Sequence, residues 1–428
     1  MKILILGGNG FIGSAVLARL AAEGHRVTGL GRTVGRAKPG FWGAEWVKAD
    51  LATMTSAQDW AALVAGHEVI VNCAGALQDG LSDDLVAVQE WAMLALQQAA
   101  NFSGERLIVQ ISARTDGAAA ELPFLATKRR ADEALKSSGV DHVILRPALV
   151  VGRNAHGGTA LIRALAGFPR VMPVMHADSP VSTIALDDLC EAVVRAVDGR
   201  LAPGSDLTLA ANVTHSLGEV LALHRHWLGR PAASLVRVPV ILARPVTALA
   251  DLAGKLGWRS PLRSTAMTVM AGGGVKSSDG ASVPFPLKSL EQTLAENPSG
   301  VQDLWFARLY LLKAPIIVTL SLFWLISGLV PLFNMAPAMA HFDGRLGDQS
   351  ALITVIATCS LDIALGLAVL VRPAARLALI GMILTSLAYL AGASVTQFAL
   401  WFDPLEPLVK VLPSLALSVA ALAILDER

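Results

Sequence analysis

Apolar stretches of membrane-spanning length occur in the C-terminal part of this chain of 428 residues. They cover residues 314–333, 351–371, 377–395 and 405–425, and only the second and fourth contain any charged residue. A helix needs about 20 mostly apolar residues to cross the hydrocarbon core of a bilayer. The pattern therefore predicts four transmembrane helices.

The beginning of the chain has a different pattern, in which short apolar runs alternate with glycines and with amphipathic segments. Residues 2–6 (KILIL) are typical of a strand buried on both faces, and residues 14–23 carry apolar positions at helical spacing. The strand lacks the basic region and cleavage site of a signal peptide, so we expect the soluble part to stay in the cytoplasm.

Strands and helices of this kind alternate over the first half of the chain, which predicts an α/β fold with a doubly wound parallel sheet, a Rossmann domain. An all-α four-helix transmembrane domain is expected after it. We assign residues 1–230 to the Rossmann domain, residues 231–300 to a linker on the substrate side and residues 301–428 to the membrane domain.

Two parts of the linker have patterns of their own. Residues 238–256 are largely apolar but interrupted by charged residues and a proline, which favours a helix on the membrane surface or the lining of a substrate cleft. Residues 271–286 are rich in glycine and proline, which predicts a loop.

Composition agrees with this division and narrows the function. The chain is 54% hydrophobic and 16% charged, whereas soluble domains average about 25% charged residues. A net charge of +1 without a long basic run argues against nucleic acid as a partner. The three cysteines lie far apart, and His224 and His226 point in different directions on a helix, so we predict neither a disulfide framework nor a metal site.

A glycine-rich loop directly after the first strand carries the clearest chemical signal. Gly7 permits a tight turn, Gly10 lets the backbone approach a pyrophosphate, and Gly13 lets the following helix pack close to the sheet. The N-terminus of that helix then faces the phosphates. We predict dinucleotide binding by Gly7, Asn9, Gly10, Phe11, Ile12 and Gly13.

The residues after the second strand favour NADP(H) over NAD(H). NAD-selective sites place a carboxylate near this point to bind the ribose 2′-hydroxyl. The chain has no carboxylate between Glu23 and Glu45, but it has Arg32 at the strand end, with Arg36 and Lys38 beyond. Arg32 is expected to bind a 2′-phosphate; the alternative is a solvated surface arginine.

Further motifs follow in order: Asp50-Leu51 after the third strand, Asn72-Cys73-Ala74-Gly75 after the fourth, Ser112 after the fifth, Lys128 on a helix, and Arg146-Pro147 after the sixth. With the glycine loop and with residues 180–192, they resemble the extended and atypical short-chain dehydrogenase/reductase superfamily over roughly residues 1–230. Residues 286–294 more loosely resemble the tail of members related to the accessory NAD(P)H-binding subunit of respiratory complex I.

The resemblance implies roles for these residues. It places the aspartate of Asp50-Leu51 beside the adenine, the Cys73-Ala74-Gly75 turn and Pro147 against the cofactor, and Lys128 on the nicotinamide ribose. Ser112 and Lys128 are the implied catalytic residues, with Ser112 orienting a substrate carbonyl.

The chain departs from this superfamily at the acid. The superfamily has a tyrosine four residues before the lysine, whereas this chain has Phe124, which cannot donate a proton. The sequence contains two tyrosines, Tyr310 and Tyr389, both in or beside the apolar stretches. Other donors near in sequence are Thr115, Asp116, Thr127 and water, and none of them is specific.

The membrane part resembles the DoxX-like family in architecture, and that family is loosely associated with quinone-linked or thiol-linked redox systems. Basic residues precede the first span and fill the connection between the second and third, so the positive-inside rule predicts cytoplasmic termini in a cell (inner) membrane. Asp362, inside the second span, costs ~2.5–3.5 kcal/mol on insertion scales; it is either functional or an interhelical hydrogen-bond partner.

Two functions remain open from the sequence. The first is a membrane-anchored NADPH-dependent oxidoreductase that passes reducing equivalents to a quinone-like acceptor or a membrane redox protein. The second is a non-catalytic NADP(H)-binding scaffold or redox sensor of a membrane complex. Phe124 favours the second function, and the intact glycine loop is compatible with both.

Overall fold

The computed structural model describes residues 1–33, 43–75, 79–81, 84–104, 106–114, 120–271, 283–342, 344–404 and 406–426. The chain divides into two compact units. The first unit comprises mainly Met1–Asp251 and Ser260–Ala307, and the membrane unit comprises Leu252–Arg259 and Arg308–Glu427. The loop expected over residues 271–286 and the residues Arg36, Lys38, Thr115 and Asp116 fall mostly or wholly outside the described residues.

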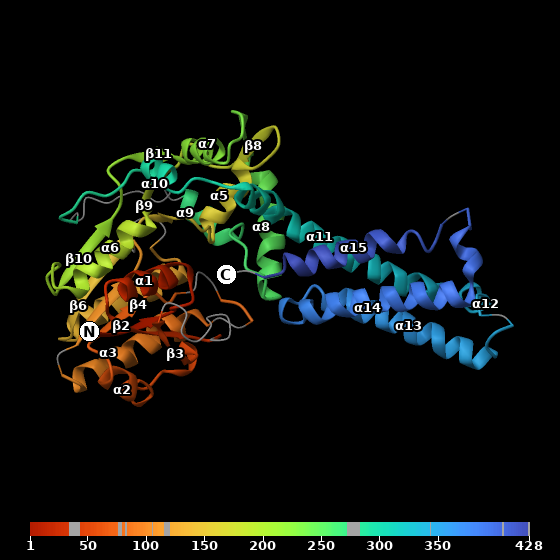
Figure 1. The fold of residues 1–428 in the computed structure, drawn as a ribbon, viewed down its shortest axis with the longest axis horizontal. Coiled ribbons are helices and arrows are strands. Elements are labelled where there is room, and N and C mark those ends of the chain that lie inside the picture. Colours follow the sequence, from red (N-terminus) through yellow and green to blue (C-terminus); the bar gives the residue numbers. More distant parts are fainter. Residues whose placement is uncertain are drawn as a thin grey trace. The chain divides into compact units, whose positions relative to one another are not determined.

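The first unit is built on a sheet of seven strands in the order β10-β6-β5-β4-β1-β2-β3, all of them parallel (Figure 1). This order confirms the predicted doubly wound fold. The strands are β1 (Lys2–Leu6), β2 (Arg26–Gly31), β3 (Glu45–Lys48), β4 (Val69–Asn72), β5 (Leu107–Ile111), β6 (Asp141–Pro147) and β10 (Ser205–Leu209).

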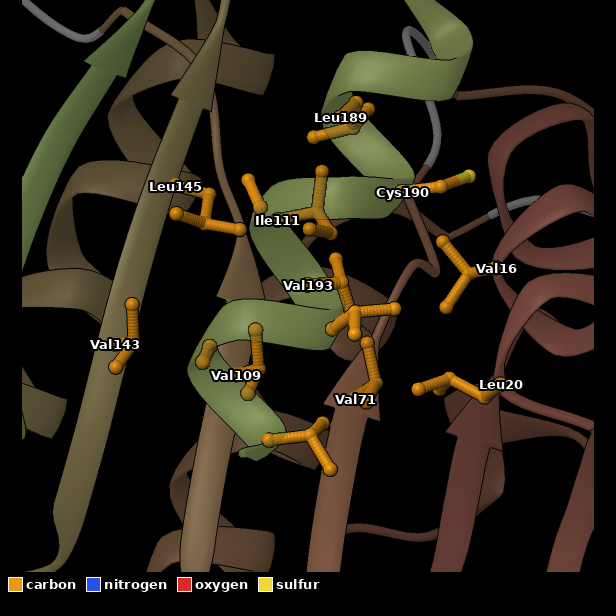
Figure 2. Packing of buried hydrophobic residues seen from close by; sticks show 14 of the residues in the cluster. Val16, Leu20, Val71, Val109, Ile111, Val143, Leu145, Leu189, Cys190 and Val193 are labelled. Atoms are coloured by element: carbon orange, nitrogen blue, oxygen red, sulfur yellow. The ribbon is translucent and has the colours of Figure 1, made fainter. Parts of the chain in front are cut away.

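Helices cover both faces of this sheet because its central strands are apolar on both sides. On one face, Val16 of α1 and Val193 of α6 pack against Val71, Val109 and neighbouring side chains of the central strands (Figure 2). The other face is covered by α2, α3 and α4, with Trp60 fully buried. The helices are α1 (Phe11–Ala22), α2 (Ala57–Ala65), α3 (Ala92–Phe102), preceded by a π-helical turn (Ala87–Trp91), α4 (Pro123–Ser137) and α6 (Leu186–Val197).

A second layer of the first unit follows β6 and carries smaller sheets. One sheet has the order β11-β9-β7 and the other pairs β12 with β8. Its elements are β7 (Leu149–Val151), α5 (Gly158–Ala166), β8 (Val171–Val174), β9 (Pro180–Ala185), β11 (Thr214–Ser216), α7 (Leu217–Trp227), β12 (Ser234–Arg237), α9 (Ser264–Ala271) and α10 (Leu290–Glu296). Helix α8 (Val240–Lys255) begins in the first unit, and its residues from Leu252 belong to the membrane unit. Asp303 is tied to this layer, since both of its oxygens lie 2.8 Å from Arg153 Nη1.

Among the described residues, three helices are long and apolar enough to cross a membrane: α11 (Val301–Phe333), α13 (Asp348–Ala368) and α14 (Arg372–Thr396). They pack closely where glycines allow it, as at Gly328 of α11, where an added Cβ would lie 2.6 Å from the Cys359 carbonyl oxygen of α13. Asp362 joins all three helices, because its carboxylate accepts hydrogen bonds from Ser327 Oγ on α11 and from the Tyr389 hydroxyl on α14, both at 2.9 Å.

The fourth predicted span is shorter than expected. It forms α15 (Val411–Ala423), whose 13 residues extend about 20 Å against the ~30 Å of a hydrocarbon core. Pro404 and Pro407 lack the amide proton that a helix interior needs, and Glu406 between them has a left-handed φ of 49°. Helical structure therefore begins only after these residues.

Hydrogen bonds nevertheless join the end of this last segment to the other membrane helices. Lys313 Nζ and Arg372 Nη2 donate to the Leu425 carbonyl oxygen at 3.1 and 3.0 Å. The beginning of the apolar part of α11, the beginning of α14 and the end of α15 thus meet at one end of the membrane unit. At the other end, Gln397 Nε2 donates to the His341 carbonyl oxygen, beside the short helix α12 (Met335–Ala340).

Candidate functional site

The glycine loop between β1 and α1 is compact because two of its glycines touch neighbouring backbone. Gly7 has a φ of 69°, and a Cβ there would lie 3.0 Å from Ala74 Cα. At Gly13 a Cβ would lie 2.1 Å from the Gly7 carbonyl oxygen, which is not possible without moving the backbone. Gly10 precedes the first residue of α1, Phe11, so the free amides of that helix end face the space above the loop.

The end of β2 lies against this loop. A Cβ at Gly31 would lie 2.9 Å from Asn9 Oδ1, and Asn9 Nδ2 donates to the Thr33 carbonyl oxygen at 3.2 Å. Arg32 therefore sits directly beside the glycine loop with an exposed side chain. This is the position at which the sequence predicts contact with a ribose 2′-phosphate.

The turns after β3 and β4 are held by their own side chains. Asp50 Oδ1 accepts from the Ala52 amide at 3.1 Å and thereby caps a 3₁₀ turn, Leu51–Thr53. After β4, the buried Asn72 accepts from the Ala74 amide at 3.0 Å, which shapes the turn from Cys73 to Gly75. Burial raises the pKa of the Cys73 thiol and so favours its protonated form.

Ser112 belongs to a network of charged residues that sequence reasoning missed. Its hydroxyl donates to Asp132 Oδ2 at 2.5 Å, and Arg146 Nη1 lies 2.9 Å from the same oxygen. Arg146 also contacts Asp206 through Nε at 2.7 Å, and Asp206 reaches Lys136 on the surface at 2.6 Å. Burial raises the pKa of the Asp132 carboxyl, against the opposing effects of Arg146 and the Ser112 hydrogen bond.

Lys128 lies one helical turn before Asp132 on α4. Its ammonium group donates to the Ile111 carbonyl oxygen at 3.1 Å, and a Cβ at Gly75 would lie 3.6 Å from it. Burial lowers the pKa of Lys128, although Asp132 acts in the opposite direction. The carboxyl ends of β4 and β5 thus bring together the Gly75 turn, Ser112 and Lys128, and Pro147 ends the adjacent strand β6.

A shallow pocket with about 280 Å³ of free volume opens at the N-terminus of α1. Gly10, Phe11 and Ser14 line one side, and Asn154, Ala155 and His156 line the other. The His156 ring stacks on the Phe11 ring with 5.9 Å between centroids and 15° between planes. The segment after β7 therefore faces the expected phosphate site. The sequence motifs did not indicate that this segment lines the site.

His224 and Asp188 make contacts within the fold. His224 is fully buried, its Nδ1 lies 2.8 Å from the Val220 carbonyl oxygen, and burial lowers its pKa to about 4. Within the part of the chain that the structure describes, no three His, Cys, Asp or Glu side chains are grouped to hold a metal ion. Asp188, in the first turn of α6, accepts a hydrogen bond from the Lys288 amide at 2.7 Å.

These features define a nicotinamide-dinucleotide-binding Rossmann domain joined to a membrane domain. Residues 7–171 match the NAD(P)H-binding family, and residues 321–419 match the DoxX-like family. The two matches confirm the predicted pairing of domains, and with α11, α13 and α14 they make the chain a membrane protein.

Known proteins are similar in sequence to parts of this chain. An uncharacterized protein of Mycobacterium tuberculosis is 26% identical over 254 residues, which cover 59% of this chain and only 26% of that protein. A chloroplast protein of Arabidopsis thaliana, High Chlorophyll Fluorescence Phenotype 244, is 24% identical over 283 residues. The alignment covers 61% of this chain and 66% of the Arabidopsis protein.

Among solved structures, a Burkholderia cenocepacia protein provisionally named an epimerase aligns with a TM-score of 0.51 at 18% identity. The alignment covers 72% of this chain and 98% of that one. At this identity the likeness concerns the fold alone.

Proposed function

We propose that this protein is a membrane-anchored NADPH-dependent oxidoreductase that passes reducing equivalents to a lipid-soluble, quinone-like acceptor. The observation that carries the proposal is the combination of an intact dinucleotide loop with a phenylalanine at position 124, in a chain that also contains a DoxX-like membrane domain. The first feature supports cofactor binding. The second argues against carbonyl chemistry that requires a phenol, and the third supports an acceptor within the bilayer.

The residues around the glycine loop fit a dinucleotide. Gly7 and Gly13 leave no room for side chains, and the pocket at Gly10 and Phe11 opens where a pyrophosphate would contact helix amides. Lys128, whose ammonium group lies beside the Gly75 turn, would bind the nicotinamide ribose. When bound, NADPH supplies a hydride, and a quinone that accepts it becomes a quinol by taking one proton from water.

Ser112 has a different task in this proposal from the one the resemblance implies. Its hydroxyl proton is engaged by Asp132 at 2.5 Å, so the hydroxyl is not free to donate to a substrate carbonyl. Asp132 and Arg146 instead fix the end of β5 through Ser112. We therefore assign Ser112 and Asp132 to positioning the cofactor side of the site, with Lys128 as the residue that contacts the cofactor.

Cofactor preference is tested at Arg32. Arg32→Asp is expected to weaken NADPH binding about 10- to 100-fold, since a charge-assisted hydrogen bond contributes ~1.5–3 kcal/mol. NADH binding should change little, because NADH lacks the 2′-phosphate. Isothermal titration of both cofactors measures the effect, and Arg26→Asp at the exposed start of β2 is the matched control. Equal losses for NADPH and NADH would contradict the role of Arg32.

The positions of basic side chains favour one orientation in the membrane. Lys313, Arg372 and Arg376 gather at one end of the membrane unit, around Leu425 and Asp426. The positive-inside rule favours the cytoplasm for that end. This orientation would expose the dinucleotide site to cytoplasmic NADPH, in a cell (inner) membrane.

The alternative function is a non-catalytic NADP(H)-binding scaffold or sensor in a membrane complex. Two observations favour it: position 124 lacks a phenol, and Ser112 is tied to Asp132. A scaffold of this kind would bind NADPH tightly and would not oxidise it with any acceptor.

The deciding experiment follows NADPH oxidation by the purified full-length chain in nanodiscs. We expect turnover with a short-chain ubiquinone and, with aldehydes and ketones, rates at least about tenfold lower, because no phenol is present to protonate an alkoxide. Phe124→Tyr should leave the quinone rate within about twofold, since the proton comes from water. Phe102→Tyr, at a position with 86% exposure, is the matched control.

The outcomes separate the hypotheses. A large gain in quinone turnover from Phe124→Tyr would show that the reaction needs a phenol and would exclude the solvent-proton mechanism. Tight NADPH binding without turnover in either form would establish the scaffold instead.

A further inference from the structure

Helix α8, Val240–Lys255, divides into three faces when its residues are placed about 100° apart around the axis. The first face consists of small residues that pack inward, with Ala243 and Ala250 5% and 9% exposed and Gly254 also buried. The second face is charged and carries Arg244, Asp251 and Lys255. The third face is apolar and spans roughly 140° of the circumference.

This apolar face is exposed along its whole length. It consists of large side chains that are between 49% and 69% exposed: Ile241, Leu242, Val246, Leu249 and Leu252. Soluble proteins rarely expose a continuous apolar surface of this kind unless it is a contact site. The face therefore needs an explanation that the packing of the first unit does not supply.

The C-terminal end of α8 runs directly into the membrane unit. The Leu256 carbonyl oxygen accepts from the Arg372 amide at 2.9 Å, and the Trp258 indole donates to the Leu370 carbonyl oxygen at 2.7 Å. The Arg372 guanidinium lies 5.5 Å from the Trp258 ring centroid. Leu370 lies in the short connection between α13 and α14, and Arg372 is the first residue of α14. A connection between two spans lies at the boundary of membrane and water.

The rise of a helix limits how far the apolar face can be from that boundary. Leu249 is seven residues before Leu256, or about 11 Å along the helix at ~1.5 Å per residue. Headgroup and interfacial regions have a similar depth, about 5–10 Å on each side. The exposed apolar face is thus within reach of the same membrane surface that the α13–α14 connection occupies.

The charged face of α8 carries the positive charge expected of a surface beside anionic lipid headgroups. Arg244 and Lys255 are basic, and the acidic Asp251 is paired with Arg263, whose Nε lies 3.2 Å from Asp251 Oδ1. Interfacial helices combine a broad apolar face with a basic edge in this way, because the edge meets lipid phosphates while the apolar side chains enter the acyl region.

We propose that α8 is an interfacial helix, whose face formed by Ile241, Leu242, Val246, Leu249 and Leu252 is buried in the surface of the lipid bilayer. The partner is an anionic lipid surface, identified by the continuity of α8 with the membrane unit and by its basic edge. The inference is independent of the chemistry proposed for the dinucleotide site, since it depends only on α8 and its anchor at Leu370 and Arg372.

The test places nitroxide labels on two sides of the same helix. Leu249→Cys and Arg244→Cys are made in the full-length chain and reconstituted in nanodiscs that contain phosphatidylglycerol. Power-saturation spectroscopy then compares collisions with oxygen, which concentrates in lipid, against collisions with a nickel chelate, which stays in water. Unsubstituted protein measures labelling of the native cysteines, of which Cys190 and Cys359 are buried.

The label at position 249 is expected to favour oxygen over the chelate by at least about threefold relative to the label at position 244. Leu242→Cys provides a second site should the first variant fail to fold, and NADPH binding checks that each variant is intact. Two results would overturn the proposal. Strong collisions with the chelate at positions 242 and 249 would place the face in water, and weak collisions with both reagents would show that protein covers it, such as a second copy of this chain.

Discussion

Gly13→Ala is expected to lower the affinity for NADPH by at least about 100-fold, because the substitution displaces the loop that holds the pyrophosphate. The added Cβ would lie 2.1 Å from the Gly7 carbonyl oxygen and 2.8 Å from the Gly7 carbonyl carbon. Both are backbone atoms, so no side-chain rotation can relieve the overlap. Helix α1 must move away from the turn at Gly7, and its amides leave the positions that face the phosphates. Titration with NADPH measures the loss.

The matched control for this variant is Gly66→Ala at the end of α2. Gly66 has ordinary helical backbone angles, and an added Cβ would make only ordinary contact, 3.4 Å from the Ala62 carbonyl oxygen. We expect NADPH affinity to remain within about twofold in that variant, since surface substitutions away from special features are nearly neutral. Unchanged affinity in Gly13→Ala would contradict the phosphate-binding role of the loop.

Arg146→Met is expected to destabilise the first unit by about 3–5 kcal/mol, because it leaves the buried Asp132 carboxylate without its ion-pair partner. Arg146 is only 14% exposed and lies within 3 Å of both Asp132 and Asp206. Methionine keeps much of the volume but supplies no donor. Denaturant unfolding of the full-length protein, followed through loss of NADPH binding, gives the change in the free energy of unfolding.

A surface ion pair serves as the comparison. Arg237 contacts Asp178 at 2.8 Å, but the two side chains are 71% and 82% exposed. Arg237→Met should therefore cost no more than about 1 kcal/mol. If both variants lowered the free energy of unfolding by the same small amount, the network at Ser112 would have to be fully hydrated in solution. That result would contradict its role in positioning the site.

The sequence was sufficient to predict the features that depend on local spacing. The glycine loop and its flanking strand and helix follow each other directly, so their pattern predicted β1, α1 and the close contacts at Gly7 and Gly13. The membrane helices α11, α13 and α14 were likewise evident from length and hydropathy. In each case the decisive interactions lie within one element or between consecutive ones.

The network around Arg146 could not be predicted in the same way. It joins Ser112 to Asp132, 20 residues away, and Arg146 to Asp206, 60 residues away. The pairings arise because β5, β6 and β10 are neighbours in the sheet, and they are visible only once that order is known. One local signal was available: Asp132 follows Lys128 by one helical turn, which places both side chains on the same side of α4.

For the fourth predicted span, hydropathy did not predict where the helix begins. Residues 405–425 are apolar enough to suggest a full crossing, yet proline and a left-handed residue delay the helix to Val411. Average hydrophobicity does not indicate where helical backbone hydrogen bonding can begin. The positions of Pro404 and Pro407 do indicate it, because proline has no amide proton.

The three-way contact at Asp362 has a consequence for how the protein is assembled in the cell. A carboxylate at mid-span costs ~2.5–3.5 kcal/mol to insert alone, and its two partners, Ser327 and Tyr389, lie on different helices. While the chain is being made, α11 precedes α13 and α14 follows it, so the tyrosine is the last partner to arrive. Release of α13 into lipid is therefore most favourable after α14 has emerged, and the two helices should leave the translocation channel as a hairpin.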